Sequence, residues 1–383
     1  MSDSALSARY GPGETNYFAG SPLNRVGFLR DDHEFLALAL THASARFVPL
    51  FKFDPAIGAG ALLFLTYADV EPLVGNPYAV SEAAAAAAFD SDAETPTLVF
   101  LGLDEAAPGI AHRGYAGQPY FAVDITPTQP ARAAAADAVH ALVVARGAAF
   151  EVVRVNYVLS PAEAAIYAQA RSYVDWNLRN PFCAGCGART LSVNGGCKRV
   201  CPPSDRGVAR PPCPSRGVVT NIAFPRSDPT IICAVVNRAG DRLLLGRNKR
   251  FPVQFYSCLA GFCEPAESVE EAVRREVWEE SGVKLGRVVI HSTQPWPYPA
   301  SLMIGAIAEA VEETIHLEHD PELGDAQWFP FADVADALHR AEHPESAVAP
   351  ADGAFQLQVP PSKAIAHVLM RAVVLQKAHL PKL

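Results

Sequence analysis

The stretch GFCEPAESVEEAVRREVWEESGV, from Gly261 to Val283, decides the fold class of this chain. It holds seven glutamates and two arginines between a glycine near each end. Ser268 followed by Glu271 is a capping box, and Gly282 is a favourable helix stop, so the spacing predicts a helix between them. The apolar positions that share one face at the helical period are Val269, Ala272, Val273 and Val277. We therefore expect an amphipathic helix whose apolar face is buried.

A second strip of the same helix gathers carboxylates. Glu276, Glu279 and Glu280 are spaced i, i+3 and i+4, so their like charges repel. A solvated helix face would intersperse lysines there, yet none occurs between Gly261 and Val283. A divalent cation removes the conflict, because hard carboxylate oxygens suit Mg²⁺ or Mn²⁺. Arg275 can then orient one of the carboxylates from the side.

The composition limits the classes of protein that this chain can be. Its 383 residues leave room for two or three domains, and no apolar run reaches the length of a membrane span. The formal charge of −9 argues against a protein dedicated to nucleic acid. The first residues show no export signal, so the eight cysteines are not expected to form a disulfide scaffold.

The first part of the chain, residues 1–155, is predicted to be an α/β domain that serves as a scaffold or for dimerisation. Three strand-like stretches and one helix are expected in it: Phe47–Pro55, Thr95–Glu105, Pro119–Pro127 and Ala131–Ala149. Residues 156–226 begin with another helix, for which Ser160 is the N-cap, Pro161 the first position and Glu163 the capping-box partner.

Residues 227–376 are predicted to form a mixed sheet flanked by helices, and residues 377–383 a tail. The expected strands are Ile231–Val236, Arg242–Leu245, Met303–Ala310 and Ala326–Phe329. A last helix is indicated by apolar positions at helical spacing, which are Ile365, Val368, Leu369, Ala372 and Leu375.

The cysteines of residues 156–226 suggest a structural zinc site. Cys183 and Cys186 form a C-x2-C knuckle, and Cys201 and Cys213 lie downstream, with Cys197 as a competitor for one position. Four thiolates suit tetrahedral Zn²⁺, which would stabilise a segment that is too rich in Gly, Pro and Cys for a core. Cys201 and Cys213 are farther apart than in a tight knuckle, so the fourth ligand, Cys213 or Cys197, stays open.

The glutamate-rich segment resembles the signature of the Nudix hydrolases, G-x5-E-x7-R-E-U-x-E-E-x-G-U. The matching positions are Gly261, Glu267, Arg275, Glu276, Val277, Glu279, Glu280, Gly282 and Val283. The resemblance implies an α/β/α sandwich with a mixed sheet, preceded by a zinc-ribbon-like segment and an N-terminal α/β Nudix-like domain. It also implies an enzyme that uses Mg²⁺ or Mn²⁺ and water to hydrolyse a nucleoside diphosphate linked to another moiety.

A second element narrows the substrate. Residues Thr293 to Ser301, in TQPWPYPAS, resemble the S-Q-P-W-P-F-P-x-S element of the NADH pyrophosphatase branch, with Thr293 and Tyr298 as conservative departures. Three prolines are expected to hold this loop extended, which leaves the Trp296 side chain available to a ligand. The resemblance implies hydrolysis of NADH, and also of NAD⁺ or NADPH, to nicotinamide mononucleotide and AMP. Two alternatives stay open: removal of NAD caps from RNA 5′ ends, and a non-catalytic nucleotide sensor.

The resemblance also implies site residues. The Mg²⁺ or Mn²⁺ ligands would be Glu276, Glu279, Glu280, Glu322 and the Ala260 carbonyl, with Glu279 as the alternative base for water. Phe262 and Phe224 would stack on a substrate base, with Phe224 contributed by the partner in a homodimer, and Ala364 would contact the ligand through its backbone. Further substrate contacts are expected at Gly261, Gln294, Trp296 and Ser301. The basic residues Arg247, Lys249 and Arg250 either assist the phosphates or form a solvated patch.

The C-terminal tripeptide Pro381, Lys382 and Leu383 is a variant of the S-K-L peroxisomal address. Proline replaces the small residue, whereas lysine and leucine fit. Eukaryotic proteins of the resembling type are often peroxisomal, so a peroxisomal location is expected, with the cytoplasm as the alternative.

Overall fold

The computed structural model describes residues 14–93, 96–126, 130–153, 157–216, 221–318, 321–346 and 355–375. They divide into two compact units. The N-terminal unit holds the described residues of 20–226 and the Pro297–Pro299 turn, and the C-terminal unit holds those of 14–19, 227–296 and 300–375. Within these ranges, no helix is long and apolar enough to cross a membrane. The division into segments 1–155, 156–226, 227–376 and 377–383 stays a prediction.

The N-terminal unit is built on a mixed seven-stranded sheet of order β3-β2-β1-β6-β4, with β5 on β6 and β7 on β2. Only the β1–β6 pair is parallel among these described strands. The strands are β1 (Arg46–Phe51), β2 (Asp54–Gly58), β3 (Ala61–Leu62), β4 (Leu98–Asp104), β5 (Ile110–His112), β6 (Tyr115–Asp124) and β7 (Ala149–Phe150).

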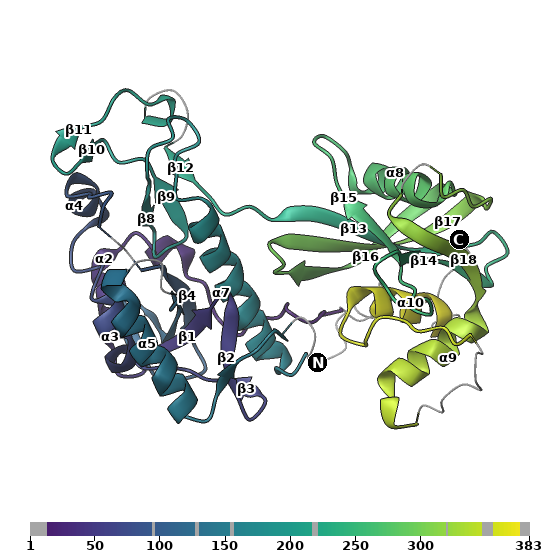
Figure 1. Cartoon of the computed structure of the whole chain (residues 1–383), viewed down its shortest axis with the longest axis horizontal. Coiled ribbons are helices and arrows are strands. Elements are labelled where there is room, and N and C mark those ends of the chain that lie inside the picture. The colour runs from purple at the N-terminus through teal and green to yellow at the C-terminus, as the bar shows by residue number, and fades with distance from the viewer. Residues whose placement is uncertain are drawn as a thin grey trace. The chain divides into compact units, whose positions relative to one another are not determined.

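Helices cover both faces of this sheet. They are η1 (Gly27–Leu29), α2 (His33–Thr41), α3 (Tyr67–Val74), α4 (Glu82–Ala87), α5 (Pro130–Ala145) and α7 (Pro161–Arg179). The side chains of Phe47, Phe100 and Phe121 are fully buried in a core shared with α2, α3 and α5. Figure 1 shows α7 on the opposite side of the sheet, where Gln169 Nε2 donates to Leu101 O at 2.8 Å. The capping box predicted at Ser160 and Glu163 is confirmed.

One expected strand of this unit is wrong. Phe47–Pro55 is not a single strand but the end of β1, a turn and the start of β2, which pair antiparallel. The chain reverses at Lys52 and Phe53, whose φ angles are 51° and 72°. Non-glycine residues rarely adopt this left-handed conformation, so the sequence carries no turn signal here.

The cysteine-containing segment of the N-terminal unit consists of short strands. A three-stranded sheet joins β8 (Leu191–Val193), β9 (Lys198–Val200) and β12 (Ile222–Ala223). A separate hairpin pairs β10 (Ser204–Asp205) with β11 (Val208–Ala209), and the short helix η2 (Pro214–Arg216) follows. Elements this short cannot bury a core of their own.

The C-terminal unit is built on a mixed six-stranded sheet of order β16-β17-β13-β14-β18, with β15 on β13. The strands are β13 (Asp228–Val236), β14 (Arg242–Asn248), β15 (Leu259–Phe262), β16 (Lys284–Trp296), β17 (Ser301–Glu312) and β18 (Leu323–Pro330). The helices are α8 (Val269–Ser281), α9 (Phe331–Glu342), η3 (Pro344–Ser346) and α10 (Ile365–Leu375). These bounds confirm the strands and the last helix expected in this region.

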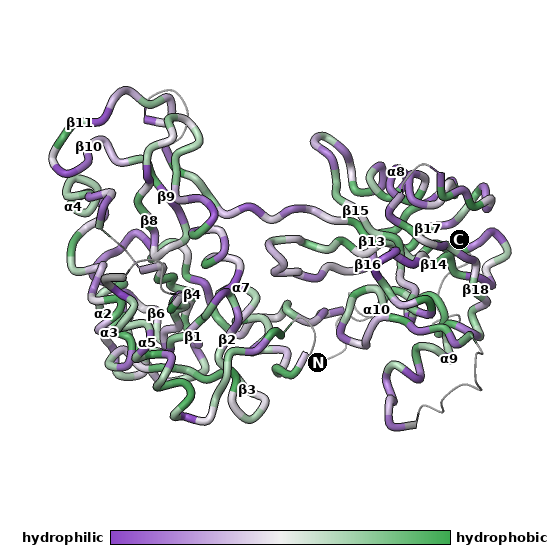
Figure 2. Tube along the Cα trace, in the orientation of Figure 1, coloured by the Kyte–Doolittle hydropathy of each residue, from purple (hydrophilic) through white to green (hydrophobic). Residues whose placement is uncertain are grey.

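Alternation along β13 shows why the C-terminal sheet has two covered faces. Ile231, Cys233 and Val235 belong to the cluster that contains the apolar face of α8. Ile232 and Ala234 point the other way, into the cluster with α9 and α10. Figure 1 shows α8 on one side of the sheet and α9 and α10 on the other, and Figure 2 shows α10 as far more hydrophobic than α8. The expected α/β/α sandwich with a mixed sheet is confirmed.

Candidate active site

The helix α8 forms as its sequence predicts. Ser268 Oγ accepts from Glu271 N at 3.2 Å, and the Glu271 carboxylate accepts from Ser268 N at 2.7 Å. Gly282 ends the helix with φ 74°, and its N–H donates to Trp278 O at 2.7 Å. Because Ala272, Val273 and Val277 are buried in the core, the rotation of α8 about its axis is fixed, and with it the position of the glutamate strip.

Glu276 lies directly on the backbone of β15. A Cβ added to Gly261 would meet the Glu276 carboxylate, with its Cδ at 2.0 Å and its two oxygens at 2.1 and 2.4 Å. Only a residue without a side chain leaves this space. The first glycine of the motif is therefore explained by packing: it makes a cradle for the Glu276 carboxylate, which comes 15 residues later in the same motif.

Arg275 joins the carboxylates of this site. Its Nη1 donates to Glu276 Oε1 at 2.9 Å and to Glu279 Oε2 at 3.0 Å. Its Nε and Nη2 donate to Glu267 at 2.6 and 2.9 Å, and Nη2 also reaches Phe262 O at 2.8 Å. The arginine thus ties α8 to the end of β15 and to Glu267, which precedes the helix.

The electrostatics follow from these contacts. The hydrogen bonds from Arg275 lower the pKa of Glu267 to about 2. The pKa of Arg275 is raised in turn, mainly by its hydrogen bonds to Glu267 and then by those to Glu276 and Glu279. Burial raises the pKa of Glu276, although Arg275 partly opposes this effect. Glu280 is only 5% exposed, whereas the Glu279 side chain is 42% exposed. The three glutamates are therefore different: one lies in a cradle, one is exposed and one is buried.

The donor set fits Mg²⁺ or Mn²⁺ in its chemistry. It consists of carboxylate oxygens, which hard divalent cations prefer, and burial of Glu276 and Glu280 makes their negative charge costly without a cation nearby. The glutamate oxygens do not converge tightly, because among the described residues only the cysteines bring three or more ligand atoms within 4.8 Å of one another. Arg275, which lies between Glu276 and Glu279, accounts for part of this separation.

Glu322 lies just before β18, beside a β-bulge of the β14–β18 pair at Arg247 and Asn248. Asn248 Nδ2 donates to Glu322 Oε1 at 2.7 Å, and Lys249 N donates to Glu322 O at 3.2 Å. Asn248 could not be selected from the sequence, because its partner is 74 residues away.

The remaining expected contacts differ in how accessible they are. Phe262, at the end of β15, is 59% exposed, and Phe224, in the N-terminal unit, is 57% exposed with Lys198 Nζ 5.2 Å from its ring centroid. Ala260 pairs with Ile232 and packs against the core beneath α9 and α10. The Ala364 N–H donates to Pro361 O at 2.9 Å, and its carbonyl accepts from His367 N at 3.0 Å.

The element around Trp296 is mostly strand rather than loop. Thr293, Gln294 and Trp296 belong to β16, with Trp296 opposite Ser301 of β17, and only the turn beyond Trp296 leaves the sheet. The expectation of an extended loop over the whole element is therefore wrong. Trp296 packs edge-to-face against Phe18, with ring centroids 5.9 Å apart.

Gln294 has a structural environment that its sequence did not reveal. The side chain is 0% exposed. Its Nε2 donates to Tyr17 O at 3.0 Å and to Lys363 O at 2.9 Å, and its Oε1 accepts from Ile365 N at 2.9 Å. Both N–H groups are used and the side chain is buried, so it joins the backbone at Tyr17 to the backbone at Lys363 and Ile365. This environment opposes the predicted direct contact with substrate.

The four cysteines expected at the zinc site lie together. The Sγ atoms of Cys183, Cys186, Cys201 and Cys213 are all within 4.8 Å of one another. Cys197 is elsewhere, with its Sγ 3.8 Å from Phe100 O, so the geometry favours Cys213 as the fourth ligand. Burial and the neighbouring thiol of Cys186 raise the pKa of Cys201 to about 12, whereas the Ser215 hydroxyl lowers the pKa of Cys213 to about 6. Four crowded thiols fit Zn²⁺, which would hold them as thiolates.

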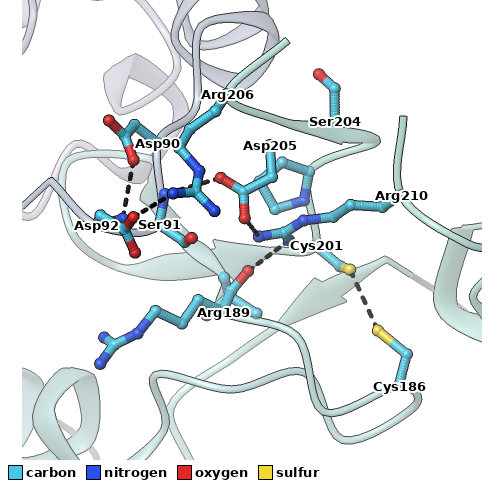
Figure 3. Close-up of polar contacts among 12 residues, drawn as sticks. Asp90, Ser91, Asp92, Cys186, Arg189, Cys201, Ser204, Asp205, Arg206 and Arg210 are labelled. Carbon is cyan, nitrogen blue, oxygen red and sulfur yellow. Dashed lines mark hydrogen bonds and ion pairs between the residues drawn. The ribbon is translucent and has the colours of Figure 1, made fainter. Parts of the chain in front are cut away.

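Arg210, which the sequence did not single out, explains how Cys201 and Cys213 come together although they are widely spaced in the sequence. Arg210 Nη1 donates to Arg189 O at 2.7 Å and its Nη2 to Asp205 at 2.8 Å, while its guanidinium lies 4.9 Å from the Phe89 ring centroid. Figure 3 shows this network beside Cys186 and Cys201. The residues between the two cysteines form the β10–β11 hairpin, which is fastened at its base by Arg210.

Comparison with known proteins agrees with both units. A family model described as a NUDIX domain matches residues 226–349, and one described as an NADH pyrophosphatase-like rudimentary NUDIX domain matches residues 58–176. The chain is 34% identical over 363 residues to the NAD-capped RNA hydrolase of Schizosaccharomyces pombe, which covers 94% of this chain and 92% of the relative.

Two human proteins show the same relationship at different coverage. NAD-capped RNA hydrolase NUDT12 of Homo sapiens is 34% identical over 389 residues, covering 93% of this chain and 72% of the relative. Mitochondrial NAD(P)H pyrophosphatase NUDT13 of Homo sapiens is 33% identical over 228 residues, covering 59% of each. With the complete glutamate motif on α8 and both domain models matched, the chain belongs to the Nudix hydrolase family, in its NADH pyrophosphatase branch.

Proposed function

We propose that this chain hydrolyses the diphosphate bond of an NAD group, with NAD-capped RNA as its principal substrate and NADH as a second one. The products would be nicotinamide mononucleotide and RNA with a 5′-monophosphate from capped RNA, and reduced nicotinamide mononucleotide and AMP from NADH. The observation that carries the choice of capped RNA is that relatives aligning with 94% and 93% of this chain, in Schizosaccharomyces pombe and Homo sapiens, are named for it. The sequence had favoured NADH, with NAD⁺ or NADPH, and had placed cap removal second. The long alignments support the opposite order.

The chain's own residues would arrange the site as follows. Glu276, Glu279, Glu280 and Glu322, with the Ala260 carbonyl, would hold Mg²⁺ or Mn²⁺. A bound divalent cation supplies neutralisation of the diphosphate and polarisation of the attacked phosphorus. Arg275 holds Glu276 and Glu279 in fixed positions. Glu279 is the most exposed of the three α8 glutamates given above, and this exposure supports a role as ligand or as the base that takes a proton from water.

Two aromatic side chains are candidates for stacking on the bases of the NAD group. Phe262 follows the cradle glycine directly, its ring is exposed, and its carbonyl is fixed by Arg275. Exposed aromatic rings in fixed positions favour base stacking. Phe224 would complete the site from the partner subunit of a homodimer. Light scattering would measure a mass of about twice 40.9 kDa if the homodimer forms, and a monomer mass would contradict this part of the proposal.

The remaining parts of the proposal concern zinc and location. Zn²⁺ bound by Cys183, Cys186, Cys201 and Cys213 would be structural, because four thiolates leave no open position. We also propose a peroxisomal location from Pro381, Lys382 and Leu383, which lie outside the described residues. Fluorescence microscopy of the tagged chain with and without these three residues tests it, and an unchanged distribution would reject the address.

One product assay tests the proposed activity. NAD-capped RNA, NADH, NAD⁺ and ADP-ribose are compared at the same Mg²⁺ concentration, and products are identified by mass. We expect nicotinamide mononucleotide from capped RNA and NAD⁺, its reduced form from NADH, and the highest kcat/KM on capped RNA. Equal rates on ADP-ribose and NADH would contradict specificity for the NAD group. Binding of NADH without any turnover would instead support the non-catalytic sensor, which the complete set of α8 glutamates opposes.

A further inference from the structure

A rigid turn follows β14 directly beside Glu322. It consists of Asn248, Lys249, Arg250 and Phe251, and we call it the basic rim. Two hydrogen bonds to Asn248 close this turn: its Oδ1 accepts from Arg250 N at 3.0 Å, and its backbone O accepts from Phe251 N at 2.9 Å. The same turn is fastened to Glu322 through the side-chain amide of Asn248 and the N–H of Lys249. The backbone that carries these cations is therefore held in place.

Packing beneath the rim relates it to the glutamates of α8. Gly246 of β14 lies between two leucines, since an added Cβ would meet Leu259 Cδ2 at 2.6 Å and Leu323 Cδ1 at 3.0 Å. Leu323 follows Glu322 directly, and Leu259 is two residues before Gly261, the cradle of Glu276. The basic rim and the cradle therefore lie at the same end of adjoining strands in the C-terminal unit.

The side chains of the basic rim are available to a ligand. Lys249 and Arg250 are exposed, and neither has an ion-pair partner among the residues that the structure describes. Phe251 is 46% exposed and is steadied by an edge-to-face contact with Phe255, with ring centroids 5.1 Å apart. Arg247 is different: a Cβ on Gly324 would meet its Nη2 at 2.9 Å, so its guanidinium lies along the sheet rather than in the rim.

The only phosphates of free NADH are the two of the diphosphate that is cleaved. Capped RNA continues beyond this diphosphate with further phosphates and bases. Two cations without an ion-pair partner in the described parts of the chain, beside an exposed ring, suit a single strand, because cations neutralise phosphates and rings stack on bases. A formal net charge of −9 makes such a local basic site necessary for any RNA to approach. Resting on the proposed function, we propose that the basic rim binds the RNA that follows the NAD cap and does not contact the cleaved diphosphate.

The test compares two double variants on two substrates. Lys249→Ala/Arg250→Ala removes the cations of the rim. The control, Arg238→Ala/Arg287→Ala, removes two exposed cations of the same unit; Arg238 lies in the turn before β14, at the opposite end of that strand. For each protein, kcat/KM is measured on NAD-capped RNA and on NADH over a range of NaCl concentrations, and circular dichroism verifies the fold.

We expect the rim variant to lose roughly tenfold in kcat/KM on capped RNA at low salt. The slope of log kcat/KM against log salt should become shallower by about 1.4, which is about 0.7 for each single-strand phosphate contact. NADH turnover should change less than about twofold in both variants, and the control should behave as wild type on both substrates. Phe251→Leu, which keeps an apolar side chain, should lose about fivefold or more on capped RNA alone if its ring stacks on a base.

Three outcomes would overturn the inference. Equal losses on both substrates would place the cations on the diphosphate. No change on either substrate, at any salt concentration, would leave the rim as a solvated patch. A wild-type protein that cleaves NADH but not capped RNA would remove the proposed principal substrate and the inference together. The wild-type assay alone thus separates failure of the proposed function from failure of the basic rim.

Discussion

Replacing Gly261 by alanine tests how closely the Glu276 carboxylate is held against β15. The added Cβ would lie 2.0 to 2.4 Å from the carboxylate atoms, and real Cβ contacts essentially never fall below 3.0 Å. The carboxylate must therefore move by about 1 Å. The backbone of Gly261 is not in the left-handed region, so alanine itself is tolerated there.

The size of the effect follows from that displacement. A misplacement of about 1 Å in a catalytic arrangement costs on the order of 100-fold in rate, or about 2.7 kcal/mol of transition-state stabilisation. Because a flexible side chain moves rather than the core, the free energy of unfolding should fall by less than about 1 kcal/mol. Steady-state kinetics with NADH and urea denaturation measure the two quantities.

Two comparisons make this prediction specific. Gly286→Ala is the control, because its Cβ would meet Val311 Cγ1 at 2.9 Å, which is a milder crowding against an exposed side chain. If Gly261 acts through Glu276, the double variant Gly261→Ala/Glu276→Gln should be no slower than Glu276→Gln alone. Full activity of Gly261→Ala, or additive losses in the double variant, would refute the cradle.

Three further predictions concern other parts of the chain. Cys213→Ser should lower the zinc content measured by mass spectrometry and decrease the melting temperature, whereas Cys197→Ser should keep the zinc; the reverse result would exchange the fourth ligand. Gln294→Ala removes three hydrogen bonds to backbone groups, two of them buried at about 1 to 3 kcal/mol each, so the free energy of unfolding should fall by about 2 kcal/mol or more, and a loss below about 1 kcal/mol would contradict this role. Burial raises the pKa of Asp32, but Phe35 N, His112 and Arg113 outweigh it and hold the pKa below the usual 3.8. This stability is present above pH 3.8 and is lost as pH falls through the lower folded pKa, so the advantage of wild type over Asp32→Asn, about 1 kcal/mol at pH 6, should shrink as the pH falls through that range; a constant difference would contradict it.

Local signals made α8 predictable. Its capping box, its stop glycine and its apolar period lie within one short stretch, so no distant residue is needed to decide them. The same stretch holds Gly261 and Glu276, and their contact closes within the motif. Sequence alone therefore predicted the helix, the strip of glutamates and the fold class.

Long-range packing could not be predicted in the same way. Gln294 depends on the backbone of Tyr17, which is 277 residues earlier in the chain. Asn248 meets Glu322 only because a β-bulge shifts the register of β14 and β18. The turn at Lys52 and Phe53 has no glycine or proline, so the expected strand ran through it. In each case the deciding partner or conformation carries no local sequence signal.

The central claim is that the glutamates of α8 perform the hydrolysis. Its most direct test is the kcat of Glu279→Gln/Glu280→Gln on NAD-capped RNA and NADH, with circular dichroism to verify the fold. Both substitutions keep the side-chain shape and remove charge, so we expect a loss of at least about 1000-fold on both substrates with an unchanged fold. Turnover equal to that of wild type would contradict the account.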